Sequence, residues 1–364
     1  MGRPRVYVDL AGGLDAEHWR ARHEVDEVPD AAPYGLHRMA REGVDVTFRP
    51  PPFTEHSGRT RTALARVARS ARHRSGAGAE LVEAFDTARR RERRAADFVL
   101  CYDERTGVPA ALVPHRFAPP TITGVAWLTS PAEAPPMMAR LARRALPRAA
   151  FVFAQSAPIV PLLTREWGVP NSRTTFVPVG IDTDFYRVQP PPERPGVVVG
   201  AGEDRNRDHQ LLIDAVASLR PHHPEIALEL ATGLPVQCPD GLVTLHTGRL
   251  DGRMRDVYAR SSVVAVALKP SITGSGLTVA LEAMASGRPV VVTANPGMDD
   301  YVVHDETGIL VPPDDRDALA AAIKALLDDP QRAAEMGAAG AARVRSMFTS
   351  AVMARHFAEL VKGL

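Results

Sequence analysis

The stretch GSGLTVALEAMASGRPVVV, residues 274–292, decides the fold of this chain. The apolar run 263–268 before it predicts a buried strand, and the glycines after that run predict a loop. Residues 278–286 then predict a short helix that ends at Gly287, and residues 289–293 predict the next strand. A strand, loop, helix and strand in this order form a βαβ unit of a parallel sheet. The helix N-terminus of such a unit lies at the carboxyl edge of the sheet, where free N–H groups and the helix dipole favour an anion.

Glu282 is the only charged residue between residues 277 and 285. Burying an unpaired carboxylate is costly, so this side chain needs a partner. One interpretation is a salt bridge to a neighbouring arginine or lysine. The other, which we favour, is a nucleoside diphosphate whose ribose hydroxyls bind both carboxylate oxygens. The donor-binding residues expected from this interpretation are Gly274, Ser275, Gly276, Leu277, Thr278 and Glu282.

Repeated alternation of strands and helices predicts an α/β protein with two doubly wound, Rossmann-like domains. The strands are expected at residues 5–10, 44–48, 97–102, 121–127, 150–155 and 174–181, and again at 197–199, 226–231, 243–246, 263–268, 290–293 and 308–311. A proline-rich linker near residue 190 separates the two series. We therefore expect an N-terminal domain over 1–189, a C-terminal domain over 190–347 and a terminal helix over 348–364 that packs back towards the first. A ligand is expected in the cleft between the domains.

Several strand ends carry residues suited to a ligand. Gly12 and Gly13 follow the first strand and suggest close approach of a ligand to the backbone, or a tight turn. Asp103 and Glu104 follow the third strand, where they could bind an acceptor or could begin a helix as its N-cap and first-turn charge; the residues leave both open. Arg205 and Arg207, in the loop after the strand at 197–199, are suited to clamp a diphosphate. This loop has neither the third glycine of a dinucleotide fingerprint nor a GK[ST] motif.

The charge of the chain is nearly balanced, with a net charge of +1, so there is no general attraction to nucleic acid. Residues 59–94 are the exception, with eleven arginines against four acidic residues. Two helices are expected there, and their arginines form either a solvated basic face or a weak contact with an anionic membrane or an acidic partner. Cys101 and Cys238 lack metal or redox spacing, no apolar run could span a bilayer, and no signal peptide is evident. These features predict a cytoplasmic protein, with peripheral contact at the inner membrane face as the alternative.

The triplet Asp182-Thr183-Asp184 superficially matches a metal-binding DxD motif. It lies between a strand and the proline-rich linker, where aspartates are typical of turns. We expect no metal and no cofactor.

Three segments resemble the retaining glycosyltransferases of family 4, which have the GT-B fold. Residues 176–185 resemble the interdomain segment of that family, residues 270–291 resemble its donor-site signature, and residues 307–313 resemble the strand that follows. These motifs cover most of the C-terminal half and are quite specific. In the N-terminal half the resemblance rests mainly on the order of elements.

The resemblance implies a role for several residues. Glu282 matches the second glutamate of the family's E-x7-E motif, which holds the donor ribose. Arg207 matches the lysine of its diphosphate-binding Arg/Lys pair. Three positions depart from the pattern: the first glutamate of the motif falls on Gly274, no arginine stands near residues 201–202, and no histidine stands near residues 125–127.

The resemblance implies transfer of a sugar from a UDP- or GDP-linked donor to a hydroxyl of a small-molecule, glycan or lipid-linked acceptor. Retention of the anomeric configuration follows from it, and Arg205 and Arg207 would stabilise the leaving diphosphate. The three departures keep a catalytically silent binding subunit as an alternative. A GT-B sugar-nucleotide epimerase is a weaker one.

Overall fold

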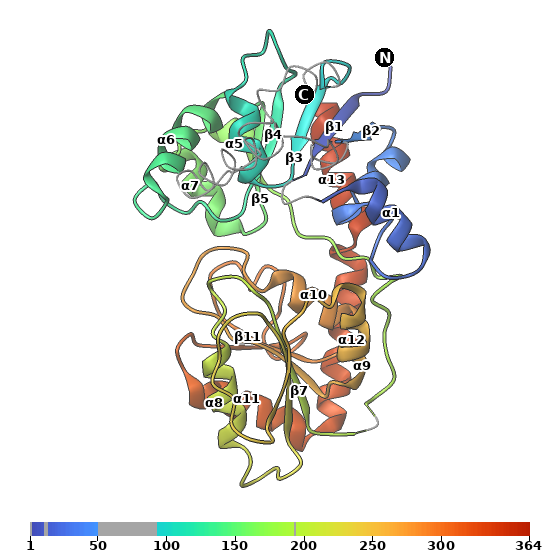
Figure 1. Cartoon of the computed structure of the whole chain (residues 1–364), viewed down its shortest axis with the longest axis vertical. Coiled ribbons are helices and arrows are strands. Elements are labelled where there is room, and N and C mark those ends of the chain that lie inside the picture. The colour runs from blue at the N-terminus through green and yellow to red at the C-terminus, as the bar shows by residue number, and fades with distance from the viewer. Residues whose placement is uncertain (1, 11–13, 50–92, 193) are drawn as a thin grey trace, which may run out of the picture. The chain divides into compact units, whose positions relative to one another are not determined.

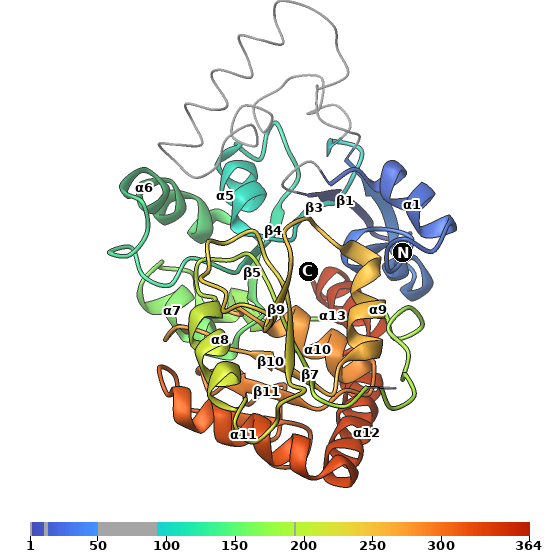
Figure 2. The same cartoon turned by 60° about the horizontal axis from the view of Figure 1, so that its bottom comes forward.

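The computed structural model describes residues 2–10, 14–49, 93–192 and 194–364. The chain divides into two compact units (Figures 1 and 2). The first comprises Met1–Glu24, Ala31–Pro178 and Met353–Leu364, and the second comprises Val25–Asp30 and Val179–Val352. Residues 179–189, which the sequence assigned to the first domain, therefore cluster with the second unit.

The first unit is built on a six-stranded, fully parallel sheet in the order β2-β1-β3-β4-β5-β6. Its strands are β1 (Arg5–Asp9), β2 (Asp45–Phe48), β3 (Phe98–Cys101), β4 (Thr121–Val125), β5 (Phe151–Ala154) and β6 (Thr174–Phe176). Its helices are α1 (Ala16–Glu24), η1 (Pro33–Glu42), α5 (Glu104–Leu112), α6 (Pro136–Ala145), η3 (Leu146–Arg148), η4 (Ala157–Ile159), α7 (Val160–Arg165) and η5 (Asn171–Arg173). The terminal helix α13 (Ser350–Gly363) adds apolar side chains from residue 353 onward to the core of this unit.

The second unit repeats the plan, with the parallel order β12-β11-β10-β7-β8-β9. Its strands are β7 (Val197–Ala201), β8 (Ala227–Ala231), β9 (Val243–His246), β10 (Val263–Val266), β11 (Val290–Thr293) and β12 (Ile309–Val311). Its helices are α8 (His209–Ser218), η6 (Asp251–Arg253), α9 (Met254–Arg260), α10 (Leu277–Ala285), α11 (Arg316–Asp328) and α12 (Pro330–Met347). The two sheets confirm the expected fold class.

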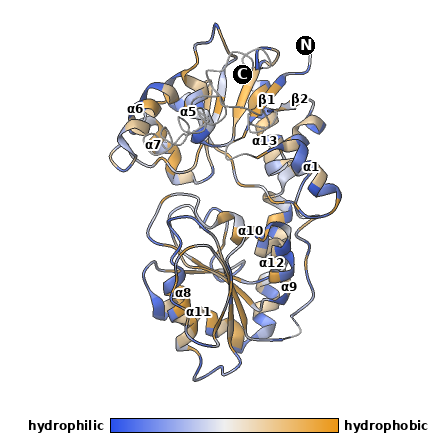
Figure 3. Ribbon diagram, viewed as in Figure 1, coloured by the Kyte–Doolittle hydropathy of each residue, from blue (hydrophilic) through white to orange (hydrophobic). Residues whose placement is uncertain are grey.

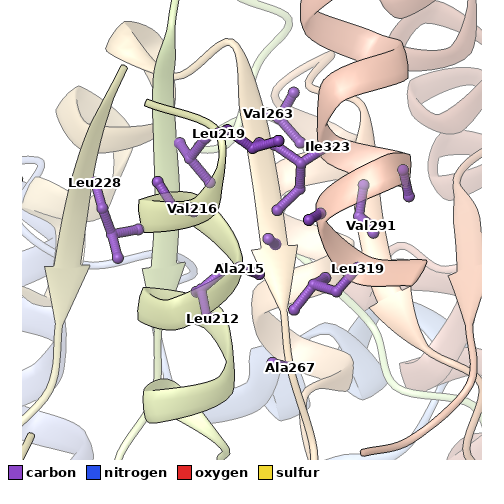
Figure 4. Packing of buried hydrophobic residues seen from close by; sticks show 14 of the residues in the cluster. Leu212, Ala215, Val216, Leu219, Leu228, Val263, Ala267, Val291, Leu319 and Ile323 are labelled. Atoms are coloured by element: carbon purple, nitrogen blue, oxygen red, sulfur yellow. The ribbon is translucent and has the colours of Figure 1, made fainter. Parts of the chain in front are cut away.

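Apolar side chains of α8 and α11 cover one face of the second sheet (Figure 4). Leu212 and Val216 of α8 and Ile323 of α11 are fully buried against strand residues such as Val263. Strands β7, β10, β11 and β12 of this sheet are almost entirely hydrophobic (Figure 3), as expected for a parallel sheet covered on both faces. The strands β8 and β9 on the other side carry polar residues such as Glu229 and Thr244. No helix within the described part of the chain combines the length and the apolar character needed to cross a bilayer.

All twelve expected strands are present, and the structure differs from the expectations in three details. Residues 14–32 were expected to be irregular, but 16–24 form α1; this helix buries only Ala16, so it has no apolar periodicity to reveal it. The helix expected at 34–41 is the 3₁₀ helix η1, and Tyr34 and Gly35 at its start have left-handed backbone angles. The strand expected at 174–181 ends at Phe176, shortly before Pro178, which has no N–H to donate to a sheet. Apart from Arg93 and Arg94, the arginine-rich helices lie outside the described residues.

Asp182 forms the buried turn at which the second unit begins. One carboxylate oxygen accepts hydrogen bonds from the backbone N–H groups of Asp184 (3.0 Å) and Phe185 (3.3 Å). The other accepts from the N–H of Asp30 (2.7 Å), whose own carboxylate accepts from the hydroxyl of Ser350 (2.6 Å). Asp182 thereby connects the segment 25–30 to the rest of the second unit. This is the turn-forming geometry that the sequence favoured for the triplet.

Replacing Asp182 by alanine should lower the free energy of unfolding by about 1–3 kcal/mol, because buried N–H donors lose their acceptor. Asp184→Ala is the matched control, because Asp184 is exposed and contributes its backbone N–H rather than its carboxylate. The control should stay within about 0.5 kcal/mol of the wild type. Urea unfolding of both variants measures this difference, and equal midpoints would show that the Asp182 carboxylate has no such role.

Candidate functional site

The second sheet reverses its winding direction between β7 and β10. The chain runs from β7 to β8 and β9 on one side, and returns to β10 on the other side of β7. Loops that leave adjacent strands at such a point form a crevice at the carboxyl edge, where α/β proteins bind ligands. Backbone hydrogen bonds join the two loops here: Asp208 N–H donates to the Ala267 carbonyl (3.0 Å) and Lys269 N–H to the Asn206 carbonyl (2.8 Å). The loop after β7 and the glycine loop are thus parts of one site.

The guanidinium group of Arg207 lies between the glycines of these two loops. A Cβ at Gly202, which has a φ of +130°, would lie 2.2 Å from Arg207 Nε, and a Cβ at Gly276 would lie 3.4 Å from Nη1. Only 7% of the Arg207 side chain is exposed. Its Nε donates to Asp204 (2.7 Å), whereas Nη1 is buried and has no hydrogen-bond acceptor among the described residues. An unsatisfied buried donor is costly and indicates a position for an anionic ligand.

Asp204 holds the arginine and the glycine loop together. One of its carboxylate oxygens accepts from Arg207, and the other accepts from the hydroxyl of Ser275 (2.7 Å) and the N–H of Asn206 (3.1 Å). Asp204 was not identified from the sequence, although it stands three residues before Arg207, a separation at which an aspartate and an arginine can form an ion pair. Arg205, expected to act with Arg207, is exposed.

The glycine loop ends at the N-terminus of α10. Gly276 has a left-handed φ of +86°, and no side chain caps the helix. No side chain therefore competes with a ligand for the first amides of the helix, of which Leu277 N–H donates to the Gly274 carbonyl (3.4 Å), and the helix dipole adds partial positive charge. Of the other expected residues in this loop, Ser275 and Leu277 are buried, Gly274 is partly buried and Thr278 is exposed.

Glu282 lies on α10, beyond this N-terminus, and is bound by tyrosines. The Tyr258 hydroxyl donates to Glu282 Oε2 (2.9 Å), and that of Tyr186 is a second hydrogen-bonding neighbour. Burial raises the pKa of Glu282 to about 7, while the two phenols and the charge of Arg207 oppose this rise. Glu282 forms no ion pair with any described residue, so the salt-bridge interpretation finds no support in this part of the chain.

The tyrosines were not identified from the sequence, but a signal for one of them exists. Met254, Val257 and Tyr258 have helical spacing and are buried on one face of α9. A fully buried tyrosine hydroxyl needs a partner, as does the lone charge of α10. Joining these two unsatisfied groups would have predicted the pair.

The first sheet has its own reversal point, between β1 and β3. Asp103, just after β3, is the N-cap of α5: its carboxylate accepts from the N–H of Arg105 (2.9 Å) and forms an ion pair with the Arg105 guanidinium (2.6 Å).

Glu104 accepts from the N–H groups of Ala126 and Trp127, each at 2.8 Å. Burial raises the pKa of Glu104 to about 7, and the charge of Asp103 acts in the same direction. The loop after β4 is therefore held by Glu104. Gly12 and Gly13 lie outside the described residues.

Two family models match the chain, one over each half. Residues 11–180 match a model described as glycosyl transferase 4-like domain, and residues 195–329 match one described as glycosyl transferases group 1.

Among curated proteins, the chain is similar to mycobacterial and actinobacterial transferases. It is 31% identical over 196 residues to a GDP-mannose-dependent alpha-(1-6)-phosphatidylinositol monomannoside mannosyltransferase of Mycolicibacterium smegmatis, covering 47% of this chain and 51% of that protein. It is 30% identical over 220 residues to a D-inositol 3-phosphate glycosyltransferase of Pseudarthrobacter chlorophenolicus, covering 54% and 52%. These matches span about half the length of each relative.

Among solved structures, Anabaena Alr3699/HepE in complex with UDP and glucose has a TM-score of 0.66 at 18% identity, over 100% of both chains. Sucrose-phosphate synthase from Thermosynechococcus elongatus has a TM-score of 0.70 at 20% identity, over 99% of both chains. Likeness at this identity concerns the fold, which is the two-domain GT-B fold with one parallel, six-stranded sheet in each unit. The two family models, which together cover most of the chain, show that it belongs to the family 4, group 1 glycosyltransferases.

Proposed function

We propose that this protein transfers a sugar from a nucleoside diphosphate donor to a hydroxyl acceptor. The observation that carries the proposal is the buried Nη1 of Arg207, which lies beside Gly276 at the open N-terminus of α10. Arg207 already neutralises Asp204, so the positive field at this point comes from its remaining N–H groups and the helix amides. A diphosphate fits this donor set, and Glu282 lies farther along the same helix, where the ribose hydroxyls would bind.

The relatives favour nucleotide-linked donors. One is named as GDP-mannose-dependent, and a structural neighbour was solved with UDP and glucose. We propose GDP or UDP as the carrier. Asp103, which with its partner Arg105 lies at the reversal point of the first sheet, is proposed to contact the acceptor. Glu104 is already bound to two backbone N–H groups, so its proposed role is reduced to holding the loop after β4.

The proposed mechanism retains the anomeric configuration and needs neither a metal nor a cofactor. The acceptor oxygen bonds to the anomeric carbon on the face from which the diphosphate departs, and the bond from that carbon to the diphosphate oxygen breaks. The departing diphosphate takes the acceptor proton. Arg207 and the α10 amides stabilise the charge that grows on this leaving group, and the exposed Arg205 adds a smaller contribution that solvent screens.

The direct test is multiple-turnover release of nucleoside diphosphate from UDP- and GDP-sugars. Phosphatidylinositol mannoside, inositol phosphate and simple glycosides would serve as acceptors in the panel. Turnover that depends on the acceptor supports the transferase. Tight nucleotide binding without turnover for any donor and acceptor would instead favour the silent binding subunit, which the glycine at position 274 keeps as the second candidate.

Arg207→Gln should lower kcat by about 10²–10³-fold, because it removes charge that the transition state needs most. Arg205→Gln is the matched control, and its effect should be at most about tenfold because an exposed charge is screened by solvent. Thermal melts must show that both variants are folded. Equal losses in the two variants would contradict the primary role of Arg207.

Nucleoside diphosphate affinity should fall as the pH is lowered through about 7, because protonated Glu282 loses its charge-assisted bonds to the ribose. Tyr258→Phe removes a hydrogen bond that lowers the pKa of Glu282, so the midpoint of this fall should move to higher pH. Glu282→Gln should abolish the part of this pH dependence that is due to Glu282, and should keep the part that is due to the phosphates. Calorimetric titrations from pH 5.5 to 8.5 measure all three proteins. Identical profiles for the wild type and Glu282→Gln would rule out the ribose contact.

Transfer should continue in excess EDTA, because fixed protein charges replace a divalent ion at the leaving group. The measurement is the initial rate with and without EDTA, with manganese added back. Activity that EDTA abolishes and manganese restores would overturn the metal-free mechanism.

A further inference from the structure

Two tyrosines stack at the carboxyl edge of the first sheet. The ring centroids of Tyr34 and Tyr102 are 3.7 Å apart and their planes differ by 10°. Tyr102 directly follows β3 at the reversal point between β1 and β3, and Tyr34 lies at the start of η1. Tyr34 is 37% exposed, and it is the only aromatic residue among the large exposed apolar residues of the described chain. An aromatic surface thus remains open to solvent where an α/β sheet binds its ligand.

The Tyr102 ring of this stack is fixed in place by its neighbours. The Tyr102 hydroxyl accepts a hydrogen bond from Gln155 Nε2 (2.6 Å) and lies 3.7 Å from Met353 Sδ. Its ring also meets Phe153 edge to face, at a centroid distance of 6.4 Å. Tyr102 is therefore a rigid support for Tyr34.

The Tyr34 ring is held in place by a strained backbone conformation. Tyr34 has a φ of +59°, and Gly35 after it has a φ of +66°. A left-handed conformation is unfavourable for a bulky residue. Strain of this kind persists where the surrounding structure enforces it, and it is concentrated at functional sites. Here it places the Tyr34 ring on Tyr102 rather than in the core.

Polar groups lie beside the stack. Arg105 lies near Tyr34 and forms an ion pair with Asp103 (2.6 Å). Its side chain is 38% exposed. The aromatic face is thus bordered by a cation and an anion, which can donate to and accept from neighbouring hydroxyl groups.

We propose that Tyr34, supported by Tyr102, is the platform on which the saturated, polyhydroxylated ring of the acceptor stacks, with Arg105 binding its hydroxyl edge. The negative π face of tyrosine suits the C–H face of a sugar or cyclitol. The adjacent charged pair suits its hydroxyls, which a plain aromatic ring lacks. The inference rests on the proposed transferase function and specifies the chemical class of its acceptor.

The test is saturation-transfer NMR on the full-length protein with methyl α-D-mannopyranoside and myo-inositol as probes, and with phenol as the aromatic comparison. Tyr34→Phe keeps the ring and should retain the affinity of the wild type for the saturated probes. Tyr34→Gly removes the ring and suits the left-handed backbone at this position. Thermal melts of both variants show whether a loss of binding reflects unfolding. Its affinity for at least one saturated probe should fall about tenfold, roughly the energy of a good ring contact.

Three results would overturn the platform: no binding of either saturated probe to the wild type, equal binding by Tyr34→Gly, or loss of phenol binding alone. Calorimetry with GDP and UDP on the same samples separates this inference from the proposed function. If Tyr34→Gly binds nucleotide normally and the wild type binds neither sugar probe, only the platform is rejected. Absence of nucleotide binding in the wild type rejects the transferase itself.

Discussion

The position of the Arg207 guanidinium is the constraint on which the donor site depends. It fills the space beside Gly202 that a side chain would need, and it borders Gly276 at the start of α10. Asp204 fixes it from one side and ties the same loop to Ser275. One ion pair therefore sets the geometry of both loops at the reversal point of the second sheet. Arg207 Nη1, next to the helix N-terminus, is a buried donor that has no hydrogen-bond acceptor among the described residues.

This arrangement gives a physical reason for one departure from the family pattern. The arginine expected near residues 201–202 is absent, and a side chain at Gly202 would collide with Arg207. Arg207 therefore occupies the space that an arginine at Gly202 would need. The departure at Gly274 has no such explanation in the contacts of the loop.

The fold could be predicted from the sequence because both sheets are parallel and several of their strands, such as the one within 263–268, are buried, continuous apolar runs. The α1 helix could not be, since it buries one alanine, and neither could the left-handed turn at Tyr34, since no glycine or asparagine marks its first residue. Within the site, Glu282 was conspicuous as a lone charge in an apolar helix. Asp204, Tyr186 and Tyr258 were not, because their roles depend on contacts across 71, 96 and 24 residues of sequence. The loop at Asp103 was ambiguous because an N-cap and a ligand site have the same residues, and the structure shows the cap.

The central claim is that a nucleoside diphosphate binds along α10, with its phosphates at the helix N-terminus and its ribose at Glu282. A crystal structure of the protein soaked with GDP or UDP tests this most directly. The account predicts a phosphate oxygen within hydrogen-bonding distance of Arg207 Nη1 and an α10 amide, with both ribose hydroxyls on the Glu282 carboxylate. A nucleotide bound elsewhere, or one that leaves Glu282 bound only to Tyr258 and Tyr186, would contradict it.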